Sequence, residues 1–211
     1  MSEKRLVIPG EKVADEPIRM DGCYIENNAT YASVVSMAQD DKVVPLKGKY
    51  LPISGDYVVG IVSEERFSGF TIDINSPYEG QISSRELRDP LRVEDVVFVK
   101  IAFADEVNNA ALTDLRRLYG GEILEIEPVK VPRVIGRNMS MVSMIRDYTG
   151  TDIFVGKNGR LYLKGNNSAL AIEAILKICR EAHTTGLTDR IKNFLESQAQ
   201  PRENQTEPQQ S

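Results

Sequence analysis

The chain has 211 residues, 41% of them hydrophobic, and a formal net charge of −5 at pH 7. It is long enough for two or three small domains with ordinary cores, and no apolar run is long enough to span a bilayer. The single histidine, His183, excludes a multi-histidine metal site within one chain, and Cys23 and Cys179 match no metal-binding spacing. With no basic-then-apolar leader at its start, we expect a soluble cytoplasmic protein. Because the residues show no recognisable catalytic or metal-binding constellation, we expect no catalytic centre, metal or cofactor.

Residues 1–54 are predicted to form a small β domain of short strands joined by turns. Apolar runs at 22–25 and 31–35 flank the turn-forming residues 26–28, and a further turn at Asp40 and Asp41 leads into residues 42–46. Tyr24 and Tyr31 are interpreted as sheet-packing residues rather than stacking platforms. The charge is nearly balanced, with seven basic and eight acidic residues, and the sheet edges need covering.

Residues 55–118 carry about five short strands, at 55–62, 69–74, 78–82, 96–101 and 110–113, which is typical of a Greek-key barrel of the OB type. The pattern GDYVVGIV, GFTIDI, EGQISSREL and VEDVVFVKI resembles an S1 RNA-binding domain. By that resemblance Phe70 is a base-stacking residue. Phe67 and Phe70 as core fillers are the alternative. Three arginines after the third strand form a possible RNA-facing rim or, alternatively, a solvated charge run: Arg85, Arg88 and Arg92.

The pattern of residues 119–196 predicts a third domain, of the α+β class. A strand at 122–126 and a short extended entry at 129–136 lead to a loop, Gly136-Arg137-Asn138-Met139. Met141, Met144, Ile145 and Tyr148 then share one helical face, and Gly150 ends that helix. Asn158-Gly159 between two apolar runs predicts a hairpin. Asn167 or Ser168 caps a helix whose apolar face is Leu170, Ala174, Ile175 and Ile178, Thr188 and Asp189 cap a further short helix, and residues 197–211 read as a disordered tail.

This order, with a glycine loop between two helices, resembles a KH domain of the eukaryotic-type topology. In that family the loop reads Gly-x-x-Gly and clamps the backbone of single-stranded RNA. Here Met139 stands at the position of the second glycine, and its Cβ restricts phosphate approach. The resemblance implies that the loop residues Gly136, Arg137, Asn138 and Met139 contact RNA. Arg133, Arg137 and Lys157 are expected to act at longer range through charge.

The distribution of charge distinguishes residues 129–180 from the rest of the chain. Residues 129–180 contain nine basic and three acidic side chains, a net charge of +6 that leaves −11 for the remainder. Residues 55–118, by contrast, contain seven basic and twelve acidic side chains. A basic face on an otherwise acidic chain favours a module that meets RNA on one face and protein on others. The alternative is that these lysines and arginines only solvate the surface.

The full order of small β domain, S1-like barrel and KH-like domain resembles the RNA-binding cap subunits of the archaeal exosome. The stretches of sequence that carry this resemblance are PGEKV, GCYIENNATYASVV, GDYVVGIV, VPRVIGRNMSMVSMI and DIFVGKNGRLYLKG. The resemblance implies a non-catalytic protein, three copies of which cap a hexameric ring of RNase PH-like subunits, alone or mixed with a zinc-ribbon cap subunit. It implies that residues 1–54 dock on the ring. The S1 and KH domains would recruit single-stranded RNA 3′ ends and guide them to the pore.

Three other classes remain open from the residues. A transcription or translation factor built from S1 and KH modules is the main alternative, although such factors usually carry two KH units. A purely architectural cap subunit without RNA contact is favoured by Met139 and the acidic barrel. A self-contained nuclease is the third, because a carboxylate site assembled from distant parts of a fold is not recognisable in the sequence.

Overall fold

The computed structural model describes residues 5–18, 20, 22–39, 42–45, 48–87, 90–105, 108–182, 184 and 186–199. The chain divides into two compact units, which are described separately. The barrel unit comprises Met1–Tyr119, Glu125–Val131 and Val155–Leu161, and the helical unit comprises Gly120–Leu124, Pro132–Phe154 and Tyr162–Ser211. The predicted domain boundaries at 54, 118 and 196 stay predictions. Prediction and structure agree on the fold class, which is mainly β in the N-terminal half and α+β after it.

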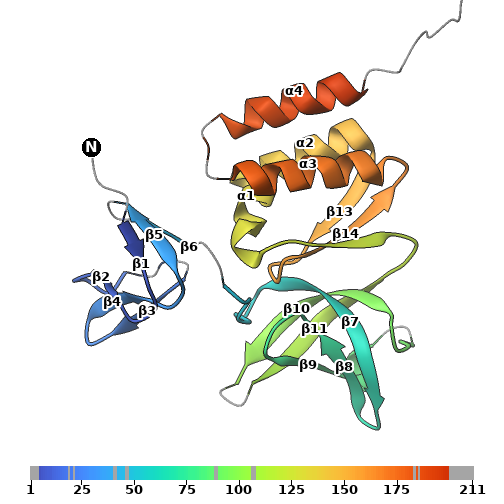
Figure 1. Cartoon of the computed structure of the whole chain (residues 1–211). Coiled ribbons are helices and arrows are strands. Elements are labelled where there is room, and N and C mark those ends of the chain that lie inside the picture. Colours follow the sequence, from blue (N-terminus) through green and yellow to red (C-terminus); the bar gives the residue numbers. More distant parts are fainter. Residues whose placement is uncertain are drawn as a thin grey trace, which may run out of the picture. The chain divides into compact units, whose positions relative to one another are not determined.

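Two three-stranded sheets form the N-terminal part of the barrel unit (Figure 1). One has the order β1-β5-β6 and the other β2-β4-β3. Their bounds are β1 Arg5–Val7, β2 Lys12–Ala14, β3 Cys23–Glu26, β4 Ala29–Ala32, β5 Ser36–Gln39 and β6 Lys42–Pro45. Asn27 and Asn28 both have positive φ, 47° and 61°, which suits the tight turn between β3 and β4. Tyr24 and Tyr31 are cross-strand partners with stacked rings 5.6 Å apart, so the sheet-packing interpretation holds.

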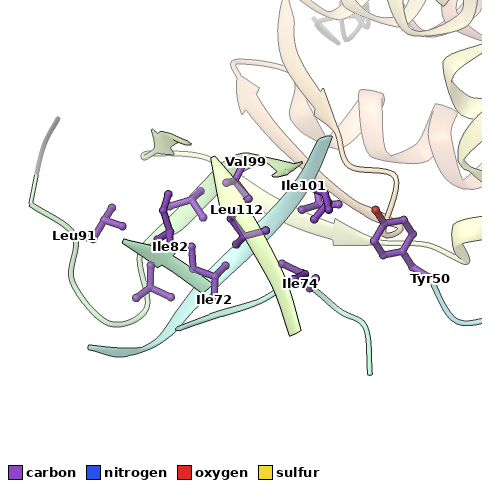
Figure 2. Close-up of a cluster of buried hydrophobic side chains, with 12 residues drawn as sticks. Tyr50, Ile72, Ile74, Ile82, Leu91, Val99, Ile101 and Leu112 are labelled. Carbon is purple, nitrogen blue, oxygen red and sulfur yellow. The ribbon is translucent and has the colours of Figure 1, made fainter. Parts of the chain in front are cut away.

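A closed five-stranded barrel follows, with the order β10-β11-β9-β8-β7, and confirms the predicted OB-type architecture. Its strands are β7 Tyr57–Arg66, β8 Gly69–Asp73, β9 Glu79–Ser83, β10 Val96–Ala104 and β11 Asn109–Leu118, with a short 3-10 helix η1 at Ser84–Glu86. β9 and β11 pair in parallel, and the other neighbours are antiparallel. Figure 2 shows the core that alternating inward side chains form, with Ile72, Val99, Ile101 and Leu112 among its members.

Tyr50 lies at one end of this barrel core, although it precedes the first barrel strand (Figure 2). Its side chain is 7% exposed. Its hydroxyl donates to Asp56 Oδ2 at 3.0 Å, and Ser76 Oγ donates to the Tyr50 carbonyl at 2.9 Å. Burial, followed by the negative charge of Asp56, raises the pKa of the Tyr50 phenol above its ordinary value. The barrel therefore needs the chain from about residue 50 onward.

The helical unit packs its helices over a three-stranded sheet of order β12-β14-β13 (Figure 1). The elements from β12 onward are β12 Glu122–Glu125, η2 Pro128–Lys130, α1 Val131–Ile135, η3 Arg137–Met139, α2 Ser140–Thr149, β13 Thr151–Val155, β14 Arg160–Gly165, α3 Ser168–Glu181 and α4 Leu187–Ala199. Of these, η2 belongs to the barrel unit. The predicted apolar faces are at the core: Met141 and Ile145 of α2 are buried, as are Leu170, Ala174, Ile175 and Ile178 of α3. α4 buries Leu187, Ile191 and Leu195.

Four local predictions differ from the structure. Residues 129–136, described as an extended entry, are mostly helical, which agrees with the predicted glycine loop between two helices; Pro128 starts η2 with a φ already fixed for a helical turn. α4 begins at Leu187, so Thr188 and Asp189 lie within its first turn rather than capping it. Asn167 is the N-cap residue of α3 but makes no side-chain capping bond. Instead, the Ser168 hydroxyl donates to Glu122. α4 continues to Ala199, beyond residue 197, and the residues after it are not described.

The turn between β13 and β14 belongs to the barrel unit. Asn158 is fully buried there, and its amide donates to the carbonyls of Val59 and Ile74, both at 2.8 Å. Arg160 donates to the carboxylates of Asp73 at 2.8 Å and Glu125 at 2.7 Å. Burial opposes the charge of Arg160, but these hydrogen bonds outweigh it and raise the pKa of the guanidinium. The Asn-Gly signal predicted the hairpin correctly, but nothing local predicted its attachment to the barrel.

Candidate nucleic-acid interface

The turn between β7 and β8 presents a fully exposed aromatic side chain. Arg66 and Gly69 are cross-strand partners, so Phe67 and Ser68 form the tip of a tight hairpin. The relative exposure of Phe67 is 108%. A Cβ on Gly69 would lie 1.9 Å from the Ile82 carbonyl oxygen, so only glycine lets β8 approach β9 this closely after the tip. The core-filling alternative is therefore wrong for Phe67, which sequence reasoning did not include among the site residues.

Phe70, the predicted stacking residue, lies on β8 between the core and the surface. It is partly buried and packs against the barrel core cluster, opposite Glu65 on β7 and Ile82 on β9. The partial burial of Phe70 against the core agrees in part with the alternative that it fills the core. Its stacking role stays a prediction, and Phe67, three residues earlier and wholly exposed, offers much more aromatic surface to a base.

The predicted arginine rim is only partly described. Arg85 lies in η1, and Arg92 precedes β10; both are exposed. The Arg92 backbone N–H donates to the Asp95 carboxylate at 2.7 Å, which fixes the loop but leaves the guanidinium outside that bond. Arg88 lies outside the described residues. Near the aromatic tip, Arg66 pairs with Glu64 at 3.0 Å, so the charge there is already neutralised.

The loop of the helical unit adopts a backbone in which three of its four residues have positive φ. The values are 71° for Gly136, 51° for Asn138 and 61° for Met139. A Cβ on Gly136 would lie 2.7 Å from the Met141 Cβ, so this position requires glycine both for its conformation and for space. Met139 therefore has the left-handed conformation that glycine adopts without strain, and its side chain is 55% exposed. The loop keeps a glycine-like backbone at a position where the side chain is methionine.

The two arginines predicted to act through charge flank this loop. Arg133 on α1 and Arg137 in η3 are both exposed. Among the described residues, neither takes part in an ion pair or a side-chain hydrogen bond, in contrast to Arg160 and Arg190. A guanidinium without a carboxylate partner keeps its full charge and its five donors for a phosphate.

Lys157 lies with the barrel unit and not with the loop residues. It is exposed in the β13–β14 turn, and its backbone N–H donates to the Tyr57 carbonyl at 2.9 Å. The predicted site residues therefore fall into two groups. One group, in the helical unit, contains Arg133, Gly136, Arg137, Asn138 and Met139; the other, in the barrel unit, contains Phe70, Arg85, Arg92 and Lys157.

The described residues contain no group of three or more His, Cys, Asp or Glu side chains that could hold a metal ion. None of the helices in the described part of the chain is long and apolar enough to cross a membrane. The features that stand out chemically are thus an exposed aromatic tip, unpaired arginines and a loop with left-handed backbone. These are groups that stack on bases and bind phosphates.

A closed OB-type barrel followed by a helical unit with this loop has the architecture of proteins that combine S1-like and KH-like modules. The chain is 38% identical over 218 residues to exosome complex component Rrp4 of Thermococcus kodakarensis, covering 91% of this chain and 85% of the relative. It is 40% identical over 223 residues to exosome complex component Rrp4 of Thermofilum pendens, covering 93% and 94%. The chain belongs to the family of exosome complex component Rrp4.

A solved structure agrees with this assignment. It is described as that of a candidate exosome complex RNA-binding protein, and it is 37% identical in sequence. The TM-score is 0.65, and the match covers 71% of this chain and 97% of that one. No protein-family model matches the chain.

Proposed function

We propose that this chain is a non-catalytic RNA-binding subunit of an exosome. It caps a ring of RNase PH-like subunits and guides single-stranded RNA 3′ ends toward the central pore, where other chains degrade or process them. The observation that carries the proposal is the similarity to exosome components over at least nine-tenths of the chain. The exposed Phe67 and the unpaired Arg133 and Arg137 supply the RNA-binding chemistry.

The aromatic tip and the arginines play different parts in this function. Every base has a π-face, so stacking on Phe67 holds RNA without regard to sequence. Arginine contacts to phosphates are also sequence-independent and weaken as salt rises. A subunit that feeds many transcripts into one chamber needs this tolerance, because a tight sequence-specific contact would stop the strand from advancing.

Ring docking is assigned to the N-terminal sheets. Within the described residues, exposed apolar side chains are unusually frequent there and give these sheets a surface suited to a protein partner. Leu6 and Ile8 are 54% and 57% exposed, and four more share this character: Ile18, Tyr24, Ile25 and Val35. Further copies of the chain, alone or with a zinc-ribbon cap subunit, complete a trimeric cap.

Affinity purification from native lysate followed by mass spectrometry tests the assembly. RNase PH-like ring subunits recovered in stoichiometric amounts are the expected result. Recovery of a polymerase or of ribosomes in their place would favour an S1 and KH transcription or translation factor. The purified chain alone should also leave labelled single-stranded RNA intact with phosphate and Mg²⁺ or Mn²⁺. Turnover that persists through repurification would contradict the non-catalytic role.

An architectural cap subunit without RNA contact is the second candidate, favoured by the acidic barrel segment, with seven basic and twelve acidic residues at 55–118. The two candidates differ in one measurement. RNA affinity of the assembled complex should fall when this chain is omitted if it binds RNA, and should not change if it is only architectural.

A further inference from the structure

A cleft of about 550 Å³ opens in the helical unit between the 136–139 loop and α4. Its first wall is formed by α1, the loop and the start of α2; its second wall is formed by Thr184, Gly186 and the first residues of α4. In Figure 1, α1 and the start of α4 lie at the same end of this unit. The volume lies in the range of sites that hold one small molecule or one nucleotide. The polar side chains that line it are Arg133, Arg137, Ser140, Thr184, Thr188 and Asp189.

The first wall is cationic. Arg133 and Arg137 both line the cleft, and both are exposed. In the part of the chain that the structure describes, no carboxylate is paired with either guanidinium. Two unpaired guanidinium groups on one wall favour an anion, and a phosphate matches their geometry.

An ion-pair network connects the second wall to the end of α3. Glu181, in the last turn of α3, accepts from Lys177 Nζ at 2.9 Å and from Arg190 Nε at 2.7 Å. The hydrogen bonds from Lys177 and Arg190 lower the pKa of the Glu181 carboxyl, which keeps it charged. The Thr184 hydroxyl donates to the Glu181 carbonyl at 2.8 Å and accepts from Arg190. The start of α4 is thereby tied to the end of α3.

Asp189 differs from the other acidic residue of this region, Glu181, because its carboxylate is not used by the network. Among the described residues, neither Asp189 nor Thr188 takes part in an ion pair or a side-chain hydrogen bond. A carboxylate only accepts hydrogen bonds, so it repels a phosphate and favours a donor. The cleft thus combines an anion-binding wall with an acceptor wall, and a ribonucleotide carries both matching groups in its phosphate and its 2′-hydroxyl.

We propose that this cleft binds one ribonucleotide of a single-stranded RNA, with its phosphate on Arg133 and Arg137 and its 2′-hydroxyl donating to Asp189. The inference rests on the RNA-binding role proposed above and adds α4 to the site. It assigns α4 a function besides packing, since a 2′-hydroxyl contact distinguishes RNA from DNA. The helical unit therefore contributes selectivity for RNA, whereas stacking on the barrel tip does not.

The test is a thermodynamic cycle on the full chain with two ligands, a single-stranded RNA and the same sequence as DNA with deoxyuridine in place of thymidine. Asp189→Ala should weaken RNA binding about tenfold, as expected for a lost hydrogen bond to a charged group. DNA binding should be unchanged or slightly stronger, because the carboxylate also repels the phosphate. Asp147→Ala is the matched control, because Asp147 is also exposed in the helical unit but lies outside the cleft. It should leave the ratio of RNA to DNA affinity at the wild-type value.

Asp189→Asn removes the same charge, which also stabilises the first turn of α4, but keeps one acceptor oxygen. Both variants therefore share any small loss of stability in the circular dichroism melting curve, whereas Asp189→Asn should weaken RNA binding only about threefold and leave DNA binding no weaker. An equal loss for RNA and DNA, or no loss for RNA, would overturn the assignment while leaving the RNA-binding role intact. Wild-type protein that binds neither ligand would overturn both.

Discussion

The side chain of Asn158 pairs with the backbone of Val59 in both directions, as a neighbouring strand would. Its Nδ2 donates to the Val59 carbonyl at 2.8 Å, and its Oδ1 accepts from the Val59 N–H at 3.3 Å. The residues are 99 positions apart in the chain and both fully buried. A third bond to the barrel strands runs from Nδ2 to the Ile74 carbonyl, and Oδ1 also accepts from the Arg160 N–H at 3.4 Å. One side chain thus satisfies backbone groups of the barrel that have no water to bond to.

Asn158→Ala should lower the free energy of unfolding by about 2–4 kcal/mol, because it leaves two buried carbonyls and one N–H without partners. Urea unfolding followed by circular dichroism measures this change. Asn193→Ala, at an exposed position of α4, is the control and should change the free energy by no more than about 0.5 kcal/mol. Equal midpoints for the two variants would show that the three bonds contribute nothing net.

Substitution by alanine is expected to change RNA affinity at Phe67 and folding stability at Phe70. Phe67→Ala should weaken RNA binding by about 1–3 kcal/mol and leave the melting temperature unchanged, because the side chain touches water on all sides. Phe70→Ala should destabilise the barrel by about 1–2 kcal/mol, less than the loss for a fully buried phenylalanine. Both affinity and melting temperature are measured on each variant. A Phe67→Ala protein that binds RNA like wild type would remove the aromatic tip from the site.

The sequence predicted the elements that depend on local pattern and missed those that depend on distant partners. The five barrel strands, the hairpin around Asn158-Gly159 and the buried faces of α2 and α3 follow from alternation and helical periodicity, and all are present. The bonds of Asn158 to the barrel were not predicted, because an Asn-Gly turn reads the same whether or not it is buried.

The candidate site shows the same division. Gly136 was recognisable because glycine at that position is a local requirement, and its φ of 71° agrees. Phe67 was weighed only as a core residue, because an aromatic between two strands reads as buried until the register is known. The Arg66 to Gly69 pairing, which places Phe67 at the tip, supplies that register. The cleft beside α4 joins residues more than forty positions apart and has no local signature.

The docking role proposed for the N-terminal sheets predicts a selective loss of assembly. The double variant Leu6→Asp and Ile8→Asp should fold normally, since both side chains are more than half exposed, but should no longer co-elute with the ring. Size-exclusion chromatography with purified ring subunits measures this. Leu176→Asp, at an exposed apolar position of α3, is the control and should co-elute like wild type. Retained co-elution of the double variant would place the docking surface elsewhere.

Removing the N-terminal sheets gives an independent check of their proposed docking role, provided that the truncation leaves the barrel core intact. It should begin just before Tyr50, because removing that residue would open the core that it helps to fill. The truncated chain should retain the circular dichroism spectrum of folded barrel and helical units and lose the ring. Undiminished co-elution would contradict docking through the N-terminal sheets.

Met139→Gly is expected to stabilise the chain. A non-glycine residue in the left-handed region costs about 1–2 kcal/mol, and the greater flexibility of glycine when unfolded offsets part of that gain. The net expectation is a rise of about 0.5–1 kcal/mol in the free energy of unfolding. RNA affinity should rise as well, because phosphates can approach the loop amides more closely. Met139→Ala separates the two effects: it shortens the exposed side chain but keeps the left-handed strain, so it should not stabilise.

Arg137 is expected to contribute to RNA binding through its charge. It is exposed, lies in the loop and has no ion-pair partner among the described residues, so a phosphate contact releases a counterion from the RNA. Arg137→Ala should therefore weaken binding similarly for all RNA sequences and flatten the slope of log K against log salt by up to about one unit. Arg180→Ala is the matched control, since Arg180 is exposed on α3 of the same unit but outside the cleft. Affinity is measured across a salt series for the chain assembled on the ring. A slope unchanged by Arg137→Ala and equal to that of the control would mean that the loop makes no phosphate contact through this residue.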